Sequence, residues 1–345
     1  MTAKNLIETA RLLVVGNKGL LAMDESVKTC NKRFTALNIP ANEQTRLAYR
    51  ELLANTAGLG EFISGAILCD ETIRQTQRSG ATFPDVLNKA GIIPGIKVDM
   101  GTTALAGHPD EKITDGLDGL RARLEDYLRI GARFAKWRAV ITVGETIPSR
   151  ACIEANAHLL ARYAALCQEV GLVPVVEPEV LMDGTHTMEH CQEVTEDVLR
   201  TVFAQLINQG VLLEGMILKP NMIVPGLSSP KQESDEDIAA ATIETLLRTV
   251  PAAMPGIVFL SGGQSSKLAT ARLNAMNLAR PVGTPALPWA MSFSYGRALQ
   301  EDALRIWNGD DANVTPAQQA LYHRAKCNWS ARAGSYNSQV ENTSA

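Results

Sequence analysis

The sequence lacks the long apolar runs of a membrane protein and the leader of a secreted one. Its apolar runs fall far short of the roughly 18 to 20 residues that span a bilayer. The first residues, MTAKNLIETARLLVVGNKG, have neither the uninterrupted apolar region nor the cleavage signal of a signal peptide. We therefore expect a cytoplasmic protein with no membrane partner.

A large excess of one charge is also lacking. There are 33 Lys and Arg residues against 37 Asp and Glu residues, giving a net charge of −4, and the two signs are interspersed. Because non-specific nucleic-acid binding needs an extended basic surface, we expect no nucleic-acid partner. Any phosphate that the protein binds should be small and locally enclosed.

Cysteine and histidine provide little material for a metal site or a disulfide framework. The six cysteines are scattered without a C-x-x-C pair, and there are only five histidines. His186-Thr-Met-Glu-His190 matches the H-x-x-E-H pattern of some zinc peptidases, but it follows a turn-like Asp-Gly pair. We interpret it as a solvated loop and expect no metal cofactor.

Hydrophobic residues, by contrast, make up 46% of the 345 residues, which is enough for a packed core. Apolar segments typical of strands alternate with amphipathic, helix-like stretches. This alternation predicts an α/β fold, a single (β/α)8 TIM barrel, over a doubly wound open sheet, which usually has fewer strands. The eight strand segments are LLAMDES, ISGAILCD, GIKVD, FAKWRAVITV, LVPVVEPEV, LEGMILKP, GIVFLSGG and WAMSFSYG.

Additional helices are expected at both ends of the barrel. Residues 2–15 predict an N-terminal helix, and residues 297–306 and 316–329 predict C-terminal helices. We expect one TIM-barrel domain over residues 1–336, followed by a short mobile tail over residues 337–345.

Charged residues are concentrated where the predicted strands end, which is the active-site face of such a barrel. Within each strand they are two residues apart, so they share one face. If that face points inward, the charges meet in one cavity, either as a structural ion-pair network or as a catalytic site. They are Asp24, Lys97, Asp99, Lys136, Arg138, Glu177, Glu179 and Lys219.

Lys219 directly follows an apolar strand segment, so its amine is expected in a partly dry pocket. Burial and a neighbouring cation such as Lys136 both favour the neutral amine. A neutral amine can attack a ketone, and the resulting protonated imine withdraws electrons from an adjacent C–C bond. Glu177 and Asp24 could then carry protons, with Glu179 orienting Glu177 or a lysine.

Two glycine-containing loops suggest phosphate binding. FLSGGQS and SYGR follow the seventh and eighth strands, whose loops form the recurrent phosphate site of this barrel. Across the barrel mouth, a second phosphate could be held by Ser26, Lys32, Arg33, Lys97 and Arg138. A small-molecule substrate that is anionic at both ends is therefore expected.

Taken together, these segments resemble the class I fructose-1,6-bisphosphate aldolases. LLAMDES, GIKVD, FAKWR, VPVVEPE, LEGMILKPN, FLSGGQS and FSYGRALQ occur in the family's order. The resemblance implies a metal-independent lyase that reversibly cleaves fructose 1,6-bisphosphate into glycerone phosphate and glyceraldehyde 3-phosphate. It also implies a homotetramer acting in glycolysis, gluconeogenesis or the Calvin cycle.

The resemblance implies roles for individual residues as well. Lys219 corresponds to the Schiff-base lysine, Glu177 to the proton donor and acceptor in imine formation, Asp24 to the base at the C4 hydroxyl, and Lys136 to a lysine that supports these transfers. The residues that surround the C1 phosphate would be Ser261, Gly262, Gly263, Ser294, Gly296 and Arg297. Those around the other end of the sugar would be Ser26, Thr29, Arg33, Lys97 and Arg138.

The sequence departs from the family's motifs at three places. Lys28 stands where the usual segment has glycine, and Met100 stands where the family has lysine. The chain also ends without the tyrosine-bearing tail that protonates the enamine in well-known members, and Tyr336 precedes that tail. Another imine-forming sugar-phosphate lyase, such as a sedoheptulose-1,7-bisphosphate aldolase, and a non-catalytic scaffold are the alternative functions.

Overall fold

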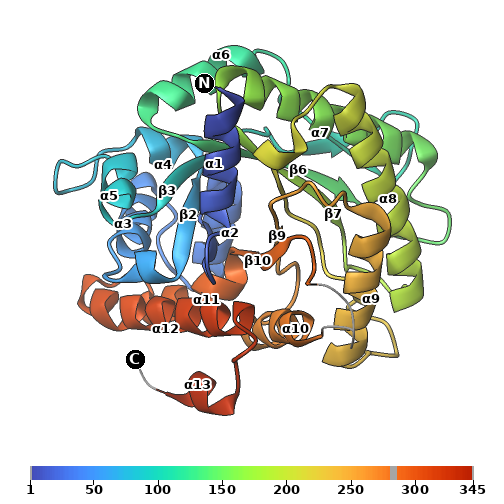
Figure 1. Ribbon diagram of the computed structural model, residues 1–345. Helices are drawn as coiled ribbons and strands as arrows, with labels where there is room; N and C mark the ends of the chain where they lie inside the picture. The colour runs from blue at the N-terminus through green and yellow to red at the C-terminus, as the bar shows by residue number, and fades with distance from the viewer. Residues whose placement is uncertain (1, 280–285, 344–345) are drawn as a thin grey trace.

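Eight parallel strands close into a ring in the computed structural model, which describes residues 2–279 and 286–343 (Figure 1). The strands follow one another around the ring in chain order, and the last pairs with the first. All eight predicted segments form these strands, so the predicted barrel is confirmed. The strands are β1 (Gly19–Ala22), β2 (Ile63–Leu68), β3 (Ile93–Lys97), β6 (Phe134–Ile141), β7 (Val173–Val180), β8 (Ile217–Leu218), β9 (Gly256–Phe259) and β10 (Ala290–Tyr295).

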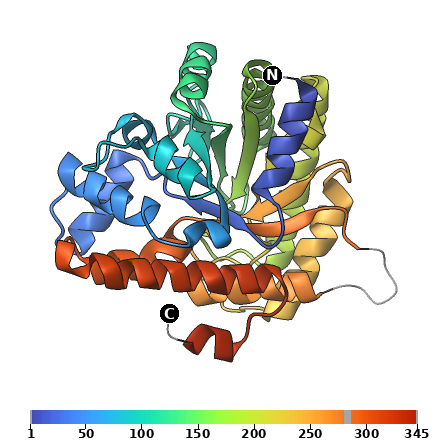
Figure 2. The same cartoon turned by 60° about the vertical axis from the view of Figure 1, so that its left-hand side comes forward.

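Helices connect the strands around the outside of the ring (Figures 1 and 2). None of the helices within the described ranges is both long and apolar enough to cross a membrane. A small hairpin of β4 (Thr102–Ala104) and β5 (Lys112–Thr114), which the sequence analysis did not predict, follows β3. The connecting helices are α2 (Val27–Ala36), α3 (Glu43–Ala54), α4 (Asp70–Arg74), α5 (Phe83–Lys89), α6 (Leu120–Ile130), α7 (Arg150–Val170), α8 (Met188–Asn208), α9 (Asp235–Thr249) and α10 (Ser266–Leu278), with 3-10 turns at Leu59–Glu61 and Leu213–Gly215.

The inward face of the strands changes from apolar to charged along the barrel axis. On β6, Phe134 packs in an interior apolar cluster, whereas Lys136 lines a cavity. On β7, Val175 and Glu177 are divided in the same way. Alternate residues of a strand share a face, so residues spaced two apart in the sequence all point into the barrel. The apolar residues therefore lie towards its amino end and the charged residues towards its carboxyl end.

Helix α1 (Ala3–Leu13) closes the amino end of the barrel, and in Figure 1 it lies across the ring of strands. Its buried Leu6, Ala10 and Leu13 join the interior apolar cluster. The approach is close, since a Cβ added to Gly256 of β9 would lie 2.6 Å from a methyl carbon of Val14. The predicted N-terminal helix therefore seals one end of the barrel and leaves the carboxyl end for the polar cavity.

The C-terminal region contains the two predicted helices, α11 (Arg297–Trp307) and α12 (Val314–Arg332), joined through a 3-10 turn at Asp311–Asn313. Where a mobile tail was expected from residue 337, the structure instead has α13 (Ser338–Asn342) beyond α12 (Figure 2). Residues 344–345 of that predicted tail lie outside the described residues.

Glu341 attaches α13 to the body of the protein. Its carboxylate accepts hydrogen bonds of 2.9 and 2.7 Å from Arg324 of α12, and Lys267 of α10 lies 3.2 Å away. Asn337 caps the helix by accepting the N–H groups of Gln339 and Val340. The sequence of the tail alone could not reveal this docking, because its cationic partners belong to distant helices.

We expect Glu341→Gln to destabilise the protein in a pH-dependent way. Burial would raise the pKa of Glu341, but Arg324 outweighs it and lowers the pKa to about 2 from its usual 4.5. The stabilisation is therefore present above the ordinary carboxyl pKa and is lost as the pH falls towards 2. Urea unfolding at about pH 7 should show a loss of roughly 1 kcal/mol, because solvent screens this partly exposed pair.

The difference from the wild type should stay constant down to about pH 5 and shrink below that. Glu244→Gln, which removes an exposed pair within α9, is the matched control. A difference of the same size at every pH would contradict the proposed ionic docking of α13.

Candidate active site

A cavity of about 700 Å³ opens at the carboxyl end of the barrel. Its lining comes from the ends of the strands, from the segments that follow them, and from α2 and α11, so residues far apart in the sequence converge as the strand pattern predicted. Lys32, expected near the second phosphate, does not line it. The predicted residues that line it are Asp24, Ser26, Thr29, Arg33, Lys97, Asp99, Lys136, Arg138, Glu177, Glu179, Lys219, Ser261, Gly262, Ser294, Gly296 and Arg297.

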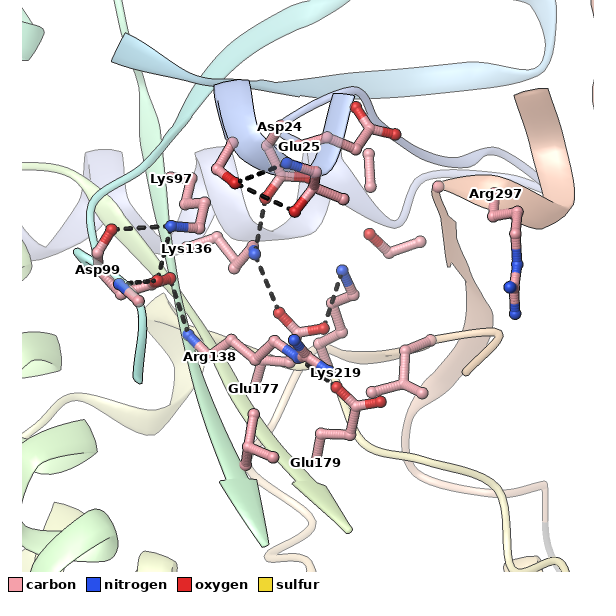
Figure 3. A pocket seen from close by; sticks show the side chains of 18 of the residues that line it. Asp24, Glu25, Lys97, Asp99, Lys136, Arg138, Glu177, Glu179, Lys219 and Arg297 are labelled. Carbon is pink, nitrogen blue, oxygen red and sulfur yellow. Dashed lines mark hydrogen bonds and ion pairs between the residues drawn. The ribbon is translucent and has the colours of Figure 1, made fainter. Parts of the chain in front are cut away.

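At the centre of the cavity, two lysines share one carboxylate (Figure 3). The Nζ of Lys219 lies 3.1 Å from one oxygen of Glu177, and the Nζ of Lys136 lies 3.3 Å from the other. Lys136 also lies 2.6 Å from Asp24. All four side chains are buried, so these contacts act with little screening by solvent.

The charges of this central group stabilise one another. Burial would raise the pKa of Asp24, but the ammonium groups of Lys136 and Lys219 outweigh it and lower the pKa to about 2. Burial would lower the pKa of Lys136, but Asp24 and Glu177 outweigh it and raise the pKa well above the usual lysine value. Asp24 is therefore a carboxylate, and Lys136 an ammonium group, at neutral pH.

The sequence pattern named Lys136 as a neighbouring cation of Lys219, and the structure shows that a carboxylate lies between them. The structure places Glu177 between Lys219 and Lys136, so the ion-pair partner of Lys219 is an anion. The position of Lys219 at the end of β8 was predicted, but this partner depends on β6, β7 and β8 being neighbours in the ring.

Further ion pairs lie around this centre. Glu179 pairs with Arg138, and not with Glu177 or a lysine, which were the partners considered from the sequence. Lys97 lies 2.6 Å from Asp99, whose second oxygen accepts the backbone N–H of Arg138 at 3.2 Å. These contacts hold the ends of β3, β6 and β7 together at the rim of the cavity.

Glu25 is a residue of the site that the sequence pattern did not indicate. Its carboxylate lines the cavity and lies between two guanidinium groups, 2.5 Å from Arg33 and 2.7 Å from Arg50. Burial would raise its pKa, but Arg50 and Arg33 outweigh it, so the pKa of Glu25 is lowered. Its position directly after Asp24 was the available signal, while its buried partner Arg50 lies on α3 and was visible only in the fold.

The carboxyl ends of β9 and β10 and the residues that follow them provide polar groups on one side of the cavity. Arg297 donates a hydrogen bond of 2.9 Å to the carbonyl oxygen of Gly262. The hydroxyl of Ser294 is buried and has no hydrogen-bond partner among residues 2–279 and 286–343. A buried hydroxyl without a partner is costly, so a ligand that bonds to it would relieve this cost.

Gly263 does not line the cavity, contrary to the expected phosphate contact. Its N–H donates to the sulfur of Met182 at 2.9 Å, and a Cβ at this position would lie 2.8 Å from Leu227. This glycine therefore allows close packing of the loop beside the site. The sequence could not distinguish the two glycines of FLSGGQS, because only the path of the loop decides which one faces the cavity.

The H-x-x-E-H segment is not the solvated loop that was expected, since its second half begins α8. Thr187 caps this helix and His190 lies in its first turn, whereas His186 precedes the cap. In the described part of the chain, the group of three potential metal ligands is His323, Cys327 and Glu341, which includes neither of these histidines. Arg324 and Lys267 already pair with that glutamate.

Comparison with known proteins identifies the family. The family model of class-I fructose-bisphosphate aldolases matches residues 5–345. The chain belongs to this family. A probable class 1 fructose-bisphosphate aldolase from Xylella fastidiosa is 55% identical over 97% of this chain and 99% of its own length. The fructose-bisphosphate aldolase of Dictyostelium discoideum is 51% identical over 99% of this chain and 96% of its own length.

A solved aldolase structure agrees with the fold as well. The aldolase from Plasmodium falciparum, crystallised in complex with TRAP and a small-molecule inhibitor, has a TM-score of 0.94 and 46% sequence identity, covering 97% of this chain and 96% of its own. The predicted family, the barrel fold and the assignment as a carbon–carbon lyase are thereby confirmed.

We expect Arg50→Met to destabilise the fold through Glu25. The substitution leaves a buried carboxylate with only the more exposed Arg33 as an ionic partner. Removing one member of a buried ion pair typically costs about 3–5 kcal/mol of unfolding free energy, which urea unfolding would measure. Replacing both residues, as in Glu25→Gln with Arg50→Met, should recover part of the loss.

Arg150→Met, which breaks the exposed pairs of Arg150 with Glu154 and Asp197, serves as the control and should lose much less stability. Equal losses in the Arg50 and Arg150 variants would show that the burial of the Glu25 pair does not matter.

Proposed function

We propose that this protein reversibly cleaves fructose 1,6-bisphosphate into glycerone phosphate and glyceraldehyde 3-phosphate through an imine on Lys219, without a metal cofactor. The observation that carries this proposal is the Glu177 carboxylate shared by Lys136 and Lys219. A class-I mechanism needs a buried amine beside a group that exchanges protons with it, and this arrangement supplies both.

Lys219 is the better placed of the two central lysines to act as the nucleophile. Lys136 is held as an ammonium group by two carboxylates, Asp24 and Glu177. Lys219 has Glu177 as its ionic partner, and this carboxylate can accept the proton that the amine must release. The freed amine then attacks the ketone carbon of the sugar to form a carbinolamine.

Glu177 then returns a proton to the carbinolamine hydroxyl, which leaves as water and yields the protonated imine. The positive charge of Lys136 lies beside Glu177 during both transfers, and it stabilises the negative charge that Glu177 loses in the first transfer and regains in the second. Glu179 holds Arg138 at the rim, and we assign it a positioning role.

Asp24 is assigned as the base for the C–C cleavage. The bond between C3 and C4 breaks, its electron pair moves into the imine to form an enamine, and the C4 hydroxyl becomes an aldehyde as its proton passes to Asp24. Lys136 keeps Asp24 ionised but also weakens it as a base. The transfer therefore accompanies the bond cleavage, when formation of the aldehyde makes the hydroxyl acidic.

The two ends of the cavity fit a substrate with two phosphates. Ser261 and Gly262 follow β9, Ser294 is on β10 and Arg297 begins α11, all close to β8, which Lys219 follows. We assign these four residues and Gly296 to the C1 phosphate. We assign the other phosphate to the opposite group, Ser26, Thr29, Arg33, Lys97 and Arg138.

The return of the enamine to an imine needs a proton, and we assign no part in this step to Tyr336. Its hydroxyl donates to Glu341 at 2.9 Å, beside α12, and it does not line the cavity. We propose that water or another group lining the cavity supplies this proton.

We further propose that the protein is a cytoplasmic homotetramer that works in glycolysis or gluconeogenesis, or in the Calvin cycle. The description of the matching family as glycolytic supports the pathway, and a relative from Arabidopsis thaliana named as a cytosolic aldolase supports the location.

Borohydride reduction in the presence of fructose 1,6-bisphosphate and EDTA tests the imine directly. We expect a stable adduct in the intact mass, and peptide mapping should place it on Lys219, because borohydride fixes an imine as a secondary amine. Lys219→Arg, which preserves the positive charge beside Glu177, should give no adduct and no cleavage.

An adduct on Lys136 would overturn the assignment of the nucleophile. Cleavage that EDTA abolishes, with no adduct, would replace the imine with metal catalysis. The exposed Lys231→Arg variant is the control for handling, and it should behave as the wild type.

A further inference from the structure

The lining of the cavity carries more positive than negative groups. Seven basic side chains face five carboxylates, and each of the five carboxylates has a basic partner within the lining. The pairs are Asp24 with Lys136, Glu25 with Arg33, Asp99 with Lys97, Glu177 with Lys136 and Lys219, and Glu179 with Arg138.

Two basic residues of the lining therefore remain without a carboxylate partner within residues 2–279 and 286–343: Lys28 and Arg297. In Figure 3, Arg297 shows no dashed line to a carboxylate, unlike Lys97, Lys136, Arg138 and Lys219. Both side chains are exposed at the cavity, and their uncompensated positive charges favour the binding of an anion there. The proposed substrate has two phosphates for these two cations.

Arg297 is placed to bind the phosphate that is next to the ketone of the sugar. It lies with Ser294 and Gly262 at the carboxyl ends of β9 and β10, which follow β8 and Lys219 around the ring. Since Lys219 attacks the carbon adjacent to the C1 phosphate ester, that phosphate must bind near Lys219. The second phosphate is at the far end of the sugar, and Lys28 is the unpaired cation that remains for it.

Lys28 occupies an unusual position for a cation. It is in the first turn of α2, where the partial positive charge of the helix dipole disfavours a lysine, and this turn contains no acidic residue. Its neighbours Ser26 and Thr29 line the same cavity with their hydroxyl groups. The N–H of Thr29 is already capped by the Ser26 hydroxyl oxygen at 3.2 Å. The first turn therefore offers a phosphate an ammonium group and two hydroxyl groups.

The departures from the family's motifs point to the same residue. Lysine is gained at position 28 and lost at position 100, and both Lys28 and Met100 line the cavity. Met100 is 72% exposed and offers no charge to an anion. The exchange thus moves one positive charge within the lining and leaves the number of cations unchanged.

We propose that Lys28 is a specificity-determining residue that binds the phosphate distant from the ketone and so selects a sugar bisphosphate over a sugar 1-phosphate. This assignment rests on the proposed function for the identity of the substrate. It depends on equilibrium binding alone, however, and can be tested separately from the chemistry.

The test is the affinity ratio for two sugars, fructose 1,6-bisphosphate and fructose 1-phosphate, measured by titration calorimetry at constant ionic strength. Lys219→Arg is the background, so that no turnover occurs. Adding Lys28→Met should weaken bisphosphate binding by roughly tenfold or more, the usual effect of losing a charge-assisted contact. Binding of the monophosphate should change by less than about twofold, because it lacks the second phosphate.

Lys28→Arg should preserve most of the ratio, because it keeps a positive charge at the same place. Lys326→Met, which removes an exposed charge on α12 outside the cavity, is the matched control and should leave both affinities unchanged. Because Lys28 is exposed, no loss of folding is expected, and thermal unfolding checks this.

An unchanged affinity ratio in Lys28→Met, or an equal loss for both sugars, overturns the assignment of Lys28. The borohydride experiment reports separately on the proposed function. A fall in the ratio without any Lys219 adduct in the wild type would leave Lys28 as a phosphate-binding residue and refute the imine mechanism.

Discussion

The Glu177 carboxylate, buried between the ammonium groups of Lys136 and Lys219, is the interaction on which the rest of the site depends. Transferring these charges out of water is costly, and the cost is offset only when each has an oppositely charged partner at contact distance. Asp24 provides a second carboxylate partner for the ammonium group of Lys136. The same closeness that stabilises the charges also lets a proton move between an amine and a carboxylate.

The barrel provides the rigid surroundings that this group needs. Alternate residues of its strands are apolar towards the amino end, where α1 closes the interior, and charged towards the carboxyl end. Because side chains within a packed barrel have little freedom, the lysines and carboxylates are held in place by the strands that carry them. The same strands thus contribute to the apolar core at the amino end of the barrel and to the charged cavity at its carboxyl end.

The outer part of the site uses charge differently from the centre. Glu25 with Arg50 and Glu179 with Arg138 satisfy cations and anions within the protein, and they fix α2, α3 and the strand ends. Lys28 and Arg297, in contrast, remain available to a ligand, as does the buried hydroxyl of Ser294. The ion pairs within the protein therefore hold the walls of the cavity in place. The donors without a partner make the cavity suitable for an anionic substrate.

Much of this organisation could be predicted from the sequence, because it depends on local periodicity. Apolar segments at regular intervals determined the eight strands, and the two-residue spacing of Lys136 and Arg138, and of Glu177 and Glu179, determined that each pair shares a face. The position of Lys219 directly after an apolar strand likewise placed its amine at the carboxyl end of the barrel. The family motifs then indicated the chemistry.

Only the tertiary structure determined which carboxylate forms an ion pair with which basic side chain. Glu177 lies between two lysines, and Glu179 pairs with Arg138. Glu25 pairs with Arg50, and the pair of Glu341 with Arg324 attaches α13 to α12. All these contacts join residues that are far apart in the sequence. The fold likewise turned Gly262, and not Gly263, towards the cavity. A sequence determines the face on which a side chain lies, whereas its partner depends on the register of neighbouring strands and the packing of helices, which form only when the whole barrel closes.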